Sequence, residues 1–221
     1  MAQMKIYSSS LQLPEYAVNM AVLLKTNTTK FSDYPIFQDV QNDTPTRLTW
    51  NDFYIRVKTI QSWLLSNGFK QGDKMAFLSK NCQEMLEIEL AVMALGGISV
   101  PIYSGYPPDQ ANRLLEFCEP TFVAIADHNQ FLKIKSPEKV RKIIHFSSVE
   151  DINLNNLIPF SDLIIHDSLP NDIMGLDIHS DTVSLMMYTS GTMGIPKCVQ
   201  LTHKNILSQQ AAMKVLWDLN H

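Results

Sequence analysis

The residues best suited to chemistry lie together in residues 189–197, which read TSGTMGIPK. Three hydroxyl side chains, two glycines and one lysine occupy these nine positions. Glycines let backbone N–H groups approach an anion because no Cβ is in the way, hydroxyls donate further hydrogen bonds, and a lysine adds a compact positive charge. This composition predicts a loop that holds phosphate groups.

The segment differs from the loop of P-loop nucleotidases, in which a Gly-Lys-Ser/Thr triplet follows the first glycine after four residues. The position five residues after Gly191 is Pro196, and Lys197 is followed by Cys198. The lysine therefore lacks both the glycine before it and the hydroxyl residue after it. The spacing disfavours P-loop NTPase chemistry.

The segment instead resembles the signature loop of the AMP-forming acyl-adenylate superfamily, whose consensus reads YTSGTTGxPKGV. Residues 188–199 match this consensus at all but two fixed positions. At roughly 6% usage per residue type, a match of this quality arises by chance in one chain with a probability of about 10⁻⁶, which disfavours an ordinary Gly/Ser-rich turn. Further landmarks of the family occur upstream in the same order: TWNDF at 49–53, GxxxGD at 68–73, Asn81, GG at 96–97 and VPIY at 100–103.

Within this superfamily the VPIY and LTHxN sequences are most similar to long-chain fatty acid–CoA ligases. The resemblance implies a reaction in two halves. A fatty acid carboxylate attacks the α-phosphorus of ATP, in the presence of Mg²⁺, to give acyl-AMP and pyrophosphate. The thiol of coenzyme A then displaces AMP.

The resemblance also implies the role of each residue in the signature segment. Lys197 neutralises charge that accumulates on the departing pyrophosphate, and it is not an acid or base. Thr189 is in addition a candidate Mg²⁺ ligand, with simple hydrogen bonding as the alternative. The residues expected to bind the β- and γ-phosphates are Thr189, Ser190, Gly191, Thr192, Gly194 and Lys197.

Two positions depart from the consensus. Met193 stands where the family usually has threonine, which removes one hydroxyl. Cys198 stands where the family usually has glycine. A side chain at this position adds bulk, and it restricts the loop if the backbone there requires a positive φ. Neither change abolishes phosphate binding outright. His203, next to the loop, is expected to open a helix, with an approach to the substrate as the secondary hypothesis.

Two alternative functions remain open. A related adenylating enzyme, such as a fatty acyl-AMP ligase, would load an acyl carrier protein in place of coenzyme A. A truncated relative would bind nucleotide or a partner subunit without catalysis.

Family members continue with adenine, Mg²⁺ and ribose motifs and a small C-terminal domain, which are expected to be absent here. We therefore expect a fragment that does not make acyl-AMP alone and that self-associates through uncovered apolar surface.

The residues upstream of the loop predict an α/β fold, in which a mostly parallel sheet carries helices on both faces, as the incomplete N-terminal part of the large domain. Thr49 and Asp52 form a capping-box pattern before a helix that Gly68 ends. Strands are predicted at 75–78, 98–102, 121–126, 142–146, 163–165 and 183–188, with a short strand through 199–201. Helices are predicted at 82–95, with Asn81 as N-cap, from Pro108 to about residue 119, and from residue 202. Residues 1–46 are expected to form an N-terminal extension and 47–221 the N-terminal portion of the AMP-binding domain.

Composition excludes several other classes. The net charge of −4, from 18 basic and 22 acidic residues, offers no strong positive field for nucleic acid. Three scattered cysteines argue against disulfides or a zinc cluster, so a cytoplasmic protein is expected.

A basic cluster at 133–142 is interpreted as a solvated patch, with peripheral membrane contact as a secondary hypothesis. Solvated helix surfaces are also expected for Glu84, Glu87, Glu89 and Glu116.

Overall fold

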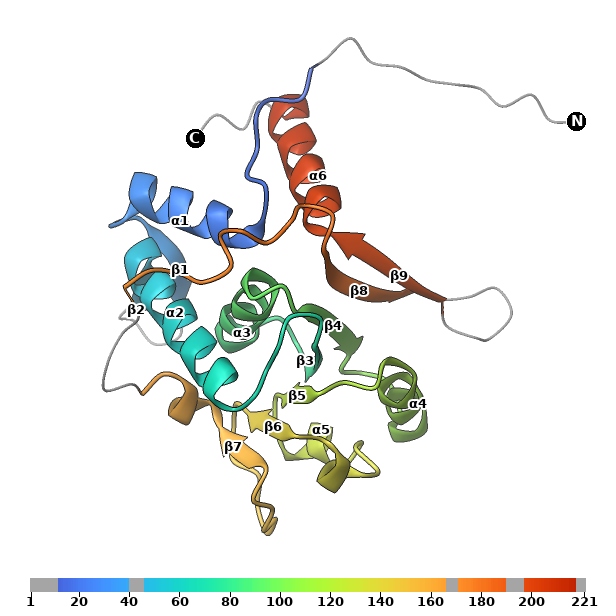
Figure 1. Cartoon of the computed structure of the whole chain (residues 1–221). Helices are drawn as coiled ribbons and strands as arrows, with labels where there is room; N and C mark the ends of the chain where they lie inside the picture. The colour runs from blue at the N-terminus through green and yellow to red at the C-terminus, as the bar shows by residue number, and fades with distance from the viewer. Residues whose placement is uncertain (1–11, 40–45, 166–170, 190–196, 218–221) are drawn as a thin grey trace, which may run out of the picture.

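The computed structural model describes residues 12–39, 46–165, 171–189 and 197–217. Seven strands form one sheet in the order β7-β6-β5-β3-β4-β8-β9 (Figure 1). All neighbours are parallel except β9, which is antiparallel to β8. The strands are β3 (Lys74–Ser79), β4 (Ile98–Tyr103), β5 (Phe122–Ile125), β6 (Lys142–His145), β7 (Leu157–Pro159), β8 (Val183–Thr189) and β9 (Lys197–Thr202).

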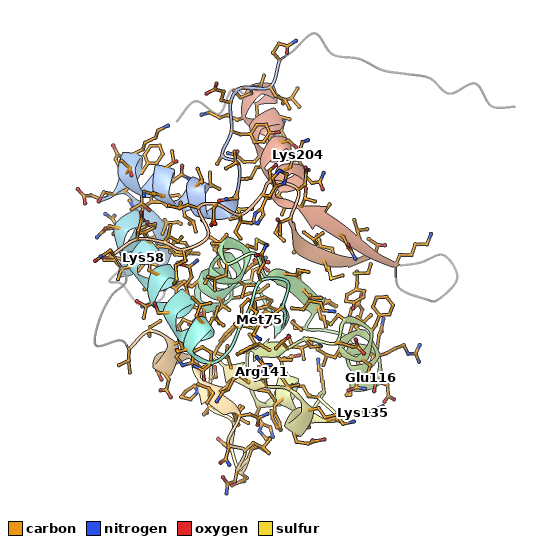
Figure 2. All side chains as sticks on the ribbon, viewed as in Figure 1. Lys58, Met75, Glu116, Lys135, Arg141 and Lys204 are labelled. Carbon is orange, nitrogen blue, oxygen red and sulfur yellow. The ribbon has the colours of Figure 1, made fainter. Side chains whose placement is uncertain are left out.

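Helices cover both faces of this sheet, as the sequence predicts. They are α1 (Met20–Phe31), α2 (Trp50–Ser66), α3 (Gln83–Ala94), α4 (Pro108–Cys118), α5 (His128–Phe131) and α6 (His203–Leu216), with 3-10 turns η1 (Pro137–Lys139) and η2 (Phe160–Leu163). Met75 and Phe77 of β3 pack with α1, α2 and α3, whereas Ala76 and Leu78 pack with α4. Figure 2 shows Met75 within this interior. The alternation along β3 builds one core on each face.

Local signals set the boundaries of the first long helix. The Thr49 side chain accepts a hydrogen bond from the Asp52 amide, and the Asp52 carboxylate accepts one from the Thr49 amide, so the predicted capping box is present. Gly68 follows the helix with a φ of +82°, a conformation that favours glycine. This helix therefore begins and ends where the sequence predicts.

Two predictions about element boundaries and types were wrong. Residues 163–165 form no strand: β7 lies at Leu157–Pro159, and Leu163 ends the turn η2 with its side chain buried. A short apolar run has no period that separates a strand from a buried turn. The N-cap of α3 is Cys82, not Asn81, and the Cys82 side chain makes no capping hydrogen bond.

Ordered structure also precedes residue 47, where the sequence gives weak patterns. Helix α1 buries Ala21 and Leu24 in the same core as α2 and α3. Strands β1 (Pro35–Asp39) and β2 (Thr46–Thr49) then form an antiparallel pair that leads into α2. Among the described residues, no helix is both long enough and apolar enough to cross a membrane.

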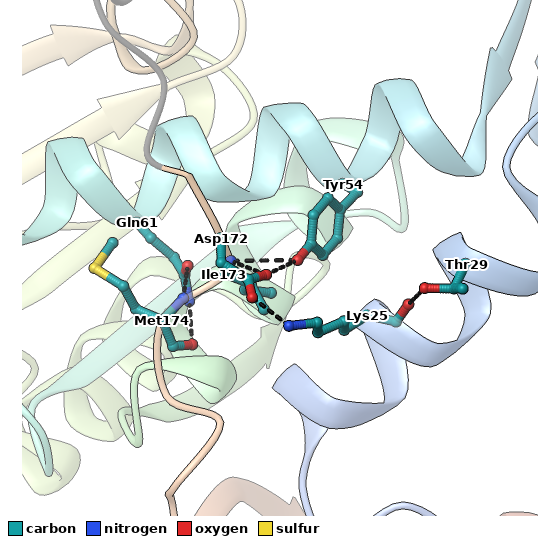
Figure 3. Close-up of polar contacts among 7 residues, drawn as sticks. All are labelled: Lys25, Thr29, Tyr54, Gln61, Asp172, Ile173 and Met174. Atoms are coloured by element: carbon teal, nitrogen blue, oxygen red, sulfur yellow. Dashed lines mark hydrogen bonds and ion pairs between the residues drawn. The ribbon is translucent and has the colours of Figure 1, made fainter.

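A connecting segment, residues 171–178, runs across α1 and α2 before β8 begins. Asp172 accepts hydrogen bonds from Lys25 and from the Tyr54 hydroxyl (Figure 3). Gln61 bonds the Met174 backbone with both ends of its amide, at 3.2 and 3.0 Å. This strap, as we call residues 171–178, fixes the direction from which the chain enters β8.

The acidic residues of α3 are less solvated than the sequence predicts. Glu87 is fully buried and accepts hydrogen bonds from Arg56 at 2.6 Å and from Gln83 at 2.8 Å. Burial raises the pKa of the Glu87 carboxyl, against the opposing effect of Arg56. Glu89, half-buried, accepts from the Ser99 hydroxyl at 2.7 Å. The expectation of solvated surfaces is therefore wrong for these two residues, because α3 packs over most of its circumference.

Candidate phosphate-binding hairpin

The described ends of the signature segment lie opposite each other. Thr189 ends β8, Lys197 begins β9, and the two residues are partners in the antiparallel register. The Thr189 hydroxyl donates to the Lys197 carbonyl oxygen at 3.5 Å, a weak bond that leaves the hydroxyl available to another group. Both residues are exposed. The open end of the hairpin thus presents a hydroxyl and a cation to solvent.

This end of the hairpin lies at the carboxyl edge of the sheet. Strand β8 is parallel to β4, so Thr189 lies at the edge where the other parallel strands also end. Open α/β sheets bind ligands outside this edge. The remaining predicted phosphate ligands, Ser190, Gly191, Thr192 and Gly194, lie outside the described residues, as does Met193.

The hairpin contacts the body of the domain through Tyr188. Its hydroxyl donates to the Leu114 carbonyl oxygen of α4 at 2.9 Å. Its ring meets Phe117 edge-on, with 6.1 Å between centroids. Burial raises the pKa of the Tyr188 hydroxyl, so the group stays neutral and able to donate. In the sequence, Tyr188 stands out only as a consensus residue, and its spacing carries no signal of a contact with α4.

Cys198 replaces the consensus glycine without backbone strain. It lies in β9 opposite Tyr188, and it is not among the described residues with positive φ. The absence of glycine would restrict the backbone only if φ were positive at this position, and the strand does not adopt that conformation. Partial burial raises the pKa of the Cys198 thiol.

Helix α6 begins directly after the hairpin. The Thr202 hydroxyl accepts from the Asn205 amide at 3.2 Å, and the Asn205 side chain accepts from the Thr202 amide at 3.0 Å, a reciprocal cap. His203 is fully buried at the first helical position, and its Nδ1 accepts from the Met20 amide at 3.4 Å. Burial lowers the pKa of His203 to about 4. Its position is that of a neutral structural group that joins α6 to α1.

The described residues offer few ligands for a metal ion. No group of three or more His, Cys, Asp or Glu side chains within the described ranges could hold one. The Thr189 hydroxyl remains exposed at the hairpin. A magnesium ion that accompanies a nucleotide takes most of its ligands from phosphate oxygens and water, so a single hydroxyl is compatible with this chemistry.

Comparisons with known proteins agree with this architecture. The sequence model described as "AMP-binding enzyme" matches residues 24–221. A medium-chain fatty-acid–CoA ligase from Escherichia coli K12 is 25% identical over 167 residues, which cover 69% of this chain and 28% of that protein. A long-chain-fatty-acid–CoA ligase from Mus musculus is 23% identical over 215 residues, covering 93% of this chain and 32% of that protein. The chain thus spans about a third of the length of these relatives.

Solved structures share the fold. The acetoacetyl-CoA synthetase from Streptomyces lividans matches with a TM-score of 0.77 at 18% identity, over 88% of this chain and 32% of that one. Identity at this level supports the fold alone. The family match covers most of the chain and includes the hairpin, and it supports the family assignment independently of the fold. The chain therefore belongs to the family of AMP-binding enzymes.

Proposed function

We propose that the β8–β9 hairpin grips the polyphosphate of ATP as part of an AMP-forming acyl-CoA synthetase that activates a fatty acid. The observation that carries this proposal is the pairing of Thr189 with Lys197 at the carboxyl edge of the sheet. A hydroxyl donor and a cation on facing strands suit the β- and γ-phosphate oxygens. The fatty-acid–CoA ligases among the relatives support the choice of fatty acid and coenzyme A.

Lys197 acts by charge in this proposal. As the α-phosphorus accepts the carboxylate, negative charge builds on the leaving pyrophosphate, and a cation held there stabilises it. Thr189 donates a hydrogen bond to a phosphate oxygen and is the candidate ligand for Mg²⁺. The ion supplies charge neutralisation to the phosphates when it is bound. Ser190, Gly191, Thr192 and Gly194 complete the proposed set of phosphate ligands.

The test is the affinity of the chain for inorganic pyrophosphate and for a non-hydrolysable ATP analogue with Mg²⁺, measured by calorimetry. We expect Lys197→Met to weaken pyrophosphate binding by about 10- to 100-fold, the range for a hydrogen bond to a charged group. Lys204→Met is the matched control, because Lys204 is an exposed lysine at the start of α6, seven residues further along the chain. Equal affinities for the wild type and Lys197→Met would contradict the proposal.

The complete reaction is proposed for a polypeptide as long as the relatives. We expect this chain alone to bind the polyphosphate without making acyl-AMP, and carboxylate-dependent ATP–pyrophosphate exchange by the pure chain would contradict this. In a longer protein, supplying coenzyme A or an acyl carrier protein as the acceptor distinguishes the synthetase from an enzyme that loads carriers. Binding without exchange in that longer protein would indicate the non-catalytic alternative.

Self-association remains a further prediction. The described surface exposes large apolar side chains near the ends of α1 and α6, with 67% of Tyr34, 66% of Leu216 and 64% of Trp217 accessible. Large exposed apolar side chains favour association when they meet in one patch. Light scattering over a dilution series should give a mass above that of one chain, and a stable monomer at all concentrations would contradict the prediction.

A further inference from the structure

The distal half of the β8–β9 hairpin departs from the rest of the sheet. Strand β3 stays in register with β4 from Lys74 to Ser79, whereas β8 aligns with β4 only at Leu185, opposite Ser99. In Figure 1 the hairpin extends beyond β4, on the side of the sheet where α4 lies. The part of β8 that leads to Thr189 is therefore paired with β9 but lacks continuous pairing with β4.

Tyr188 supplies the missing support. Its hydroxyl bond to the Leu114 carbonyl spans 74 positions of sequence and is partly buried. By contrast, the Thr189 hydroxyl bonds within the hairpin, and the Thr202 hydroxyl bonds Asn205 of α6, the helix that continues the hairpin. The ring also contacts Phe117 and packs into the core that α4 forms with β4.

We propose that Tyr188 is a positioning residue, which anchors the hairpin to α4 and so sets where Thr189 and Lys197 present their polar groups. Tyr188 directly precedes Thr189, and its cross-strand partner Cys198 directly follows Lys197. One anchored pair therefore fixes both strands directly next to the Thr189–Lys197 pair. The phosphate-binding consequence rests on the proposed function, whereas the anchoring itself does not.

The hydroxyl is the part of Tyr188 that gives this anchor a direction. Apolar contact with Phe117 tolerates sliding, because burial of apolar surface is non-directional. A hydrogen bond requires the donor to lie near the carbonyl and within a narrow angle. If the hydroxyl is removed and the ring is kept, the hairpin should stay in contact with α4, but its position should vary more.

The experiment compares wild type with Tyr188→Phe by NMR-detected hydrogen exchange in the absence of nucleotide. We expect the Thr189 and Lys197 amides to exchange about fivefold faster in the variant, the change expected from one neutral hydrogen bond. Exchange in β3 and β5 should stay unchanged. Unaltered exchange at Thr189 and Lys197 would overturn the proposal.

Tyr54→Phe is the matched control, since it also removes a hydroxyl that bonds across the fold, here to Asp172. If both variants accelerate the two hairpin amides equally, the effect is general destabilisation and the proposal is wrong. Acceleration in Tyr188→Phe alone supports it.

Pyrophosphate affinity then separates this proposal from the proposed function. Tyr188→Phe should weaken binding by about threefold to tenfold if the anchor positions a phosphate site. Faster local exchange in a chain that binds no pyrophosphate would support the anchor and contradict the phosphate-binding function. Normal exchange with weakened binding would contradict the anchor and leave that function standing.

Discussion

Strand β3 and the β8–β9 hairpin belong to one sheet but differ in how the protein holds them. The side chains from Met75 to Leu78 are fully buried between two layers of helices, whereas no residue of β9 is buried. The chemistry-bearing residues Thr189 and Lys197 lie on the less supported part. The difference indicates that stability comes mainly from the inner strands, and that the hairpin, where we propose phosphate binding, contributes little to stability.

The largest expected effect tests whether β3 contributes more to stability than the hairpin does. Phe77→Ala removes a fully buried ring from β3, and we expect a loss of about 3–5 kcal/mol in the free energy of unfolding. Met187→Ala in the hairpin, where the side chain is 44% exposed, should cost less than about 1 kcal/mol. Urea denaturation of both variants measures the two losses. Similar losses would show that the hairpin contributes as much as the inner sheet.

The free energy of unfolding should depend on pH through His203, the buried residue that joins α6 to α1. Burial lowers the pKa of His203 to about 4, below its ordinary value, so the unfolded chain binds more protons between pH 6.5 and 4. This group therefore lowers stability as the pH falls through that window, by about 3 kcal/mol at pH 4.

His203→Asn isolates this contribution. Its amide oxygen can still accept from the Met20 backbone, but the side chain does not titrate. Unfolding free energies of both chains between pH 7 and 4 should diverge in slope, with the variant less sensitive to acid. Parallel profiles would contradict the assignment of the acid response to His203.

The same comparison explains what sequence could and could not predict. Helix α2 follows from a local pattern, the capping box of Thr49 and Asp52 with Gly68 at its end, and β3 follows from a continuous apolar run. Strand β7 was misplaced because short apolar runs fit a strand and a buried turn equally well. Burial of Glu87 had a signal in the apolar residues all round α3, which leave little solvated surface for a charge.

The candidate site divides in a similar way. The motif alone predicts a phosphate-binding role for Thr189 and Lys197, because the residue types that suit phosphate lie close together in the sequence. The support from Leu114 could not be predicted, since the contact joins residues 74 positions apart without a pattern at either end. Likewise, the Asn19 amide bonds the strap at the Gly175 and Leu176 carbonyl oxygens, more than 150 positions away.

A smaller effect is expected for Thr189→Val, which keeps the shape of the side chain and removes its hydroxyl. We expect pyrophosphate affinity to fall about threefold to tenfold, as for one lost hydrogen bond. The unfolding free energy should change by less than about 0.5 kcal/mol, because Thr189 is exposed. Calorimetric titration and urea denaturation of the same preparation give both values. A large stability loss would show that this end of the hairpin is structurally important after all.

The smallest effect is expected in the strap that delivers the chain to β8. Hydrogen bonds from Lys25 and Tyr54 lower the pKa of Asp172 to about 2. A lowered carboxyl pKa contributes stability above the unfolded pKa of about 3.9 that is lost as the pH falls toward 2. The Lys25 and Asp172 side chains are 46% and 42% exposed, so solvent screens the pair and Asp172→Asn should cost less than about 1 kcal/mol at pH 7.

Two further conditions sharpen this last prediction. The difference between Asp172→Asn and wild type should shrink at high salt, because exposed ion pairs are screened, and should shrink further as the pH falls toward 2, where the wild-type carboxyl is about half protonated. Chemical denaturation at about pH 7 and about pH 2 measures the change. A loss that persists in acid would mean that the Tyr54 hydroxyl requires the wild-type side chain for geometry alone, so that the strap is held by hydrogen-bond shape, as the hairpin is at Tyr188, and not by charge.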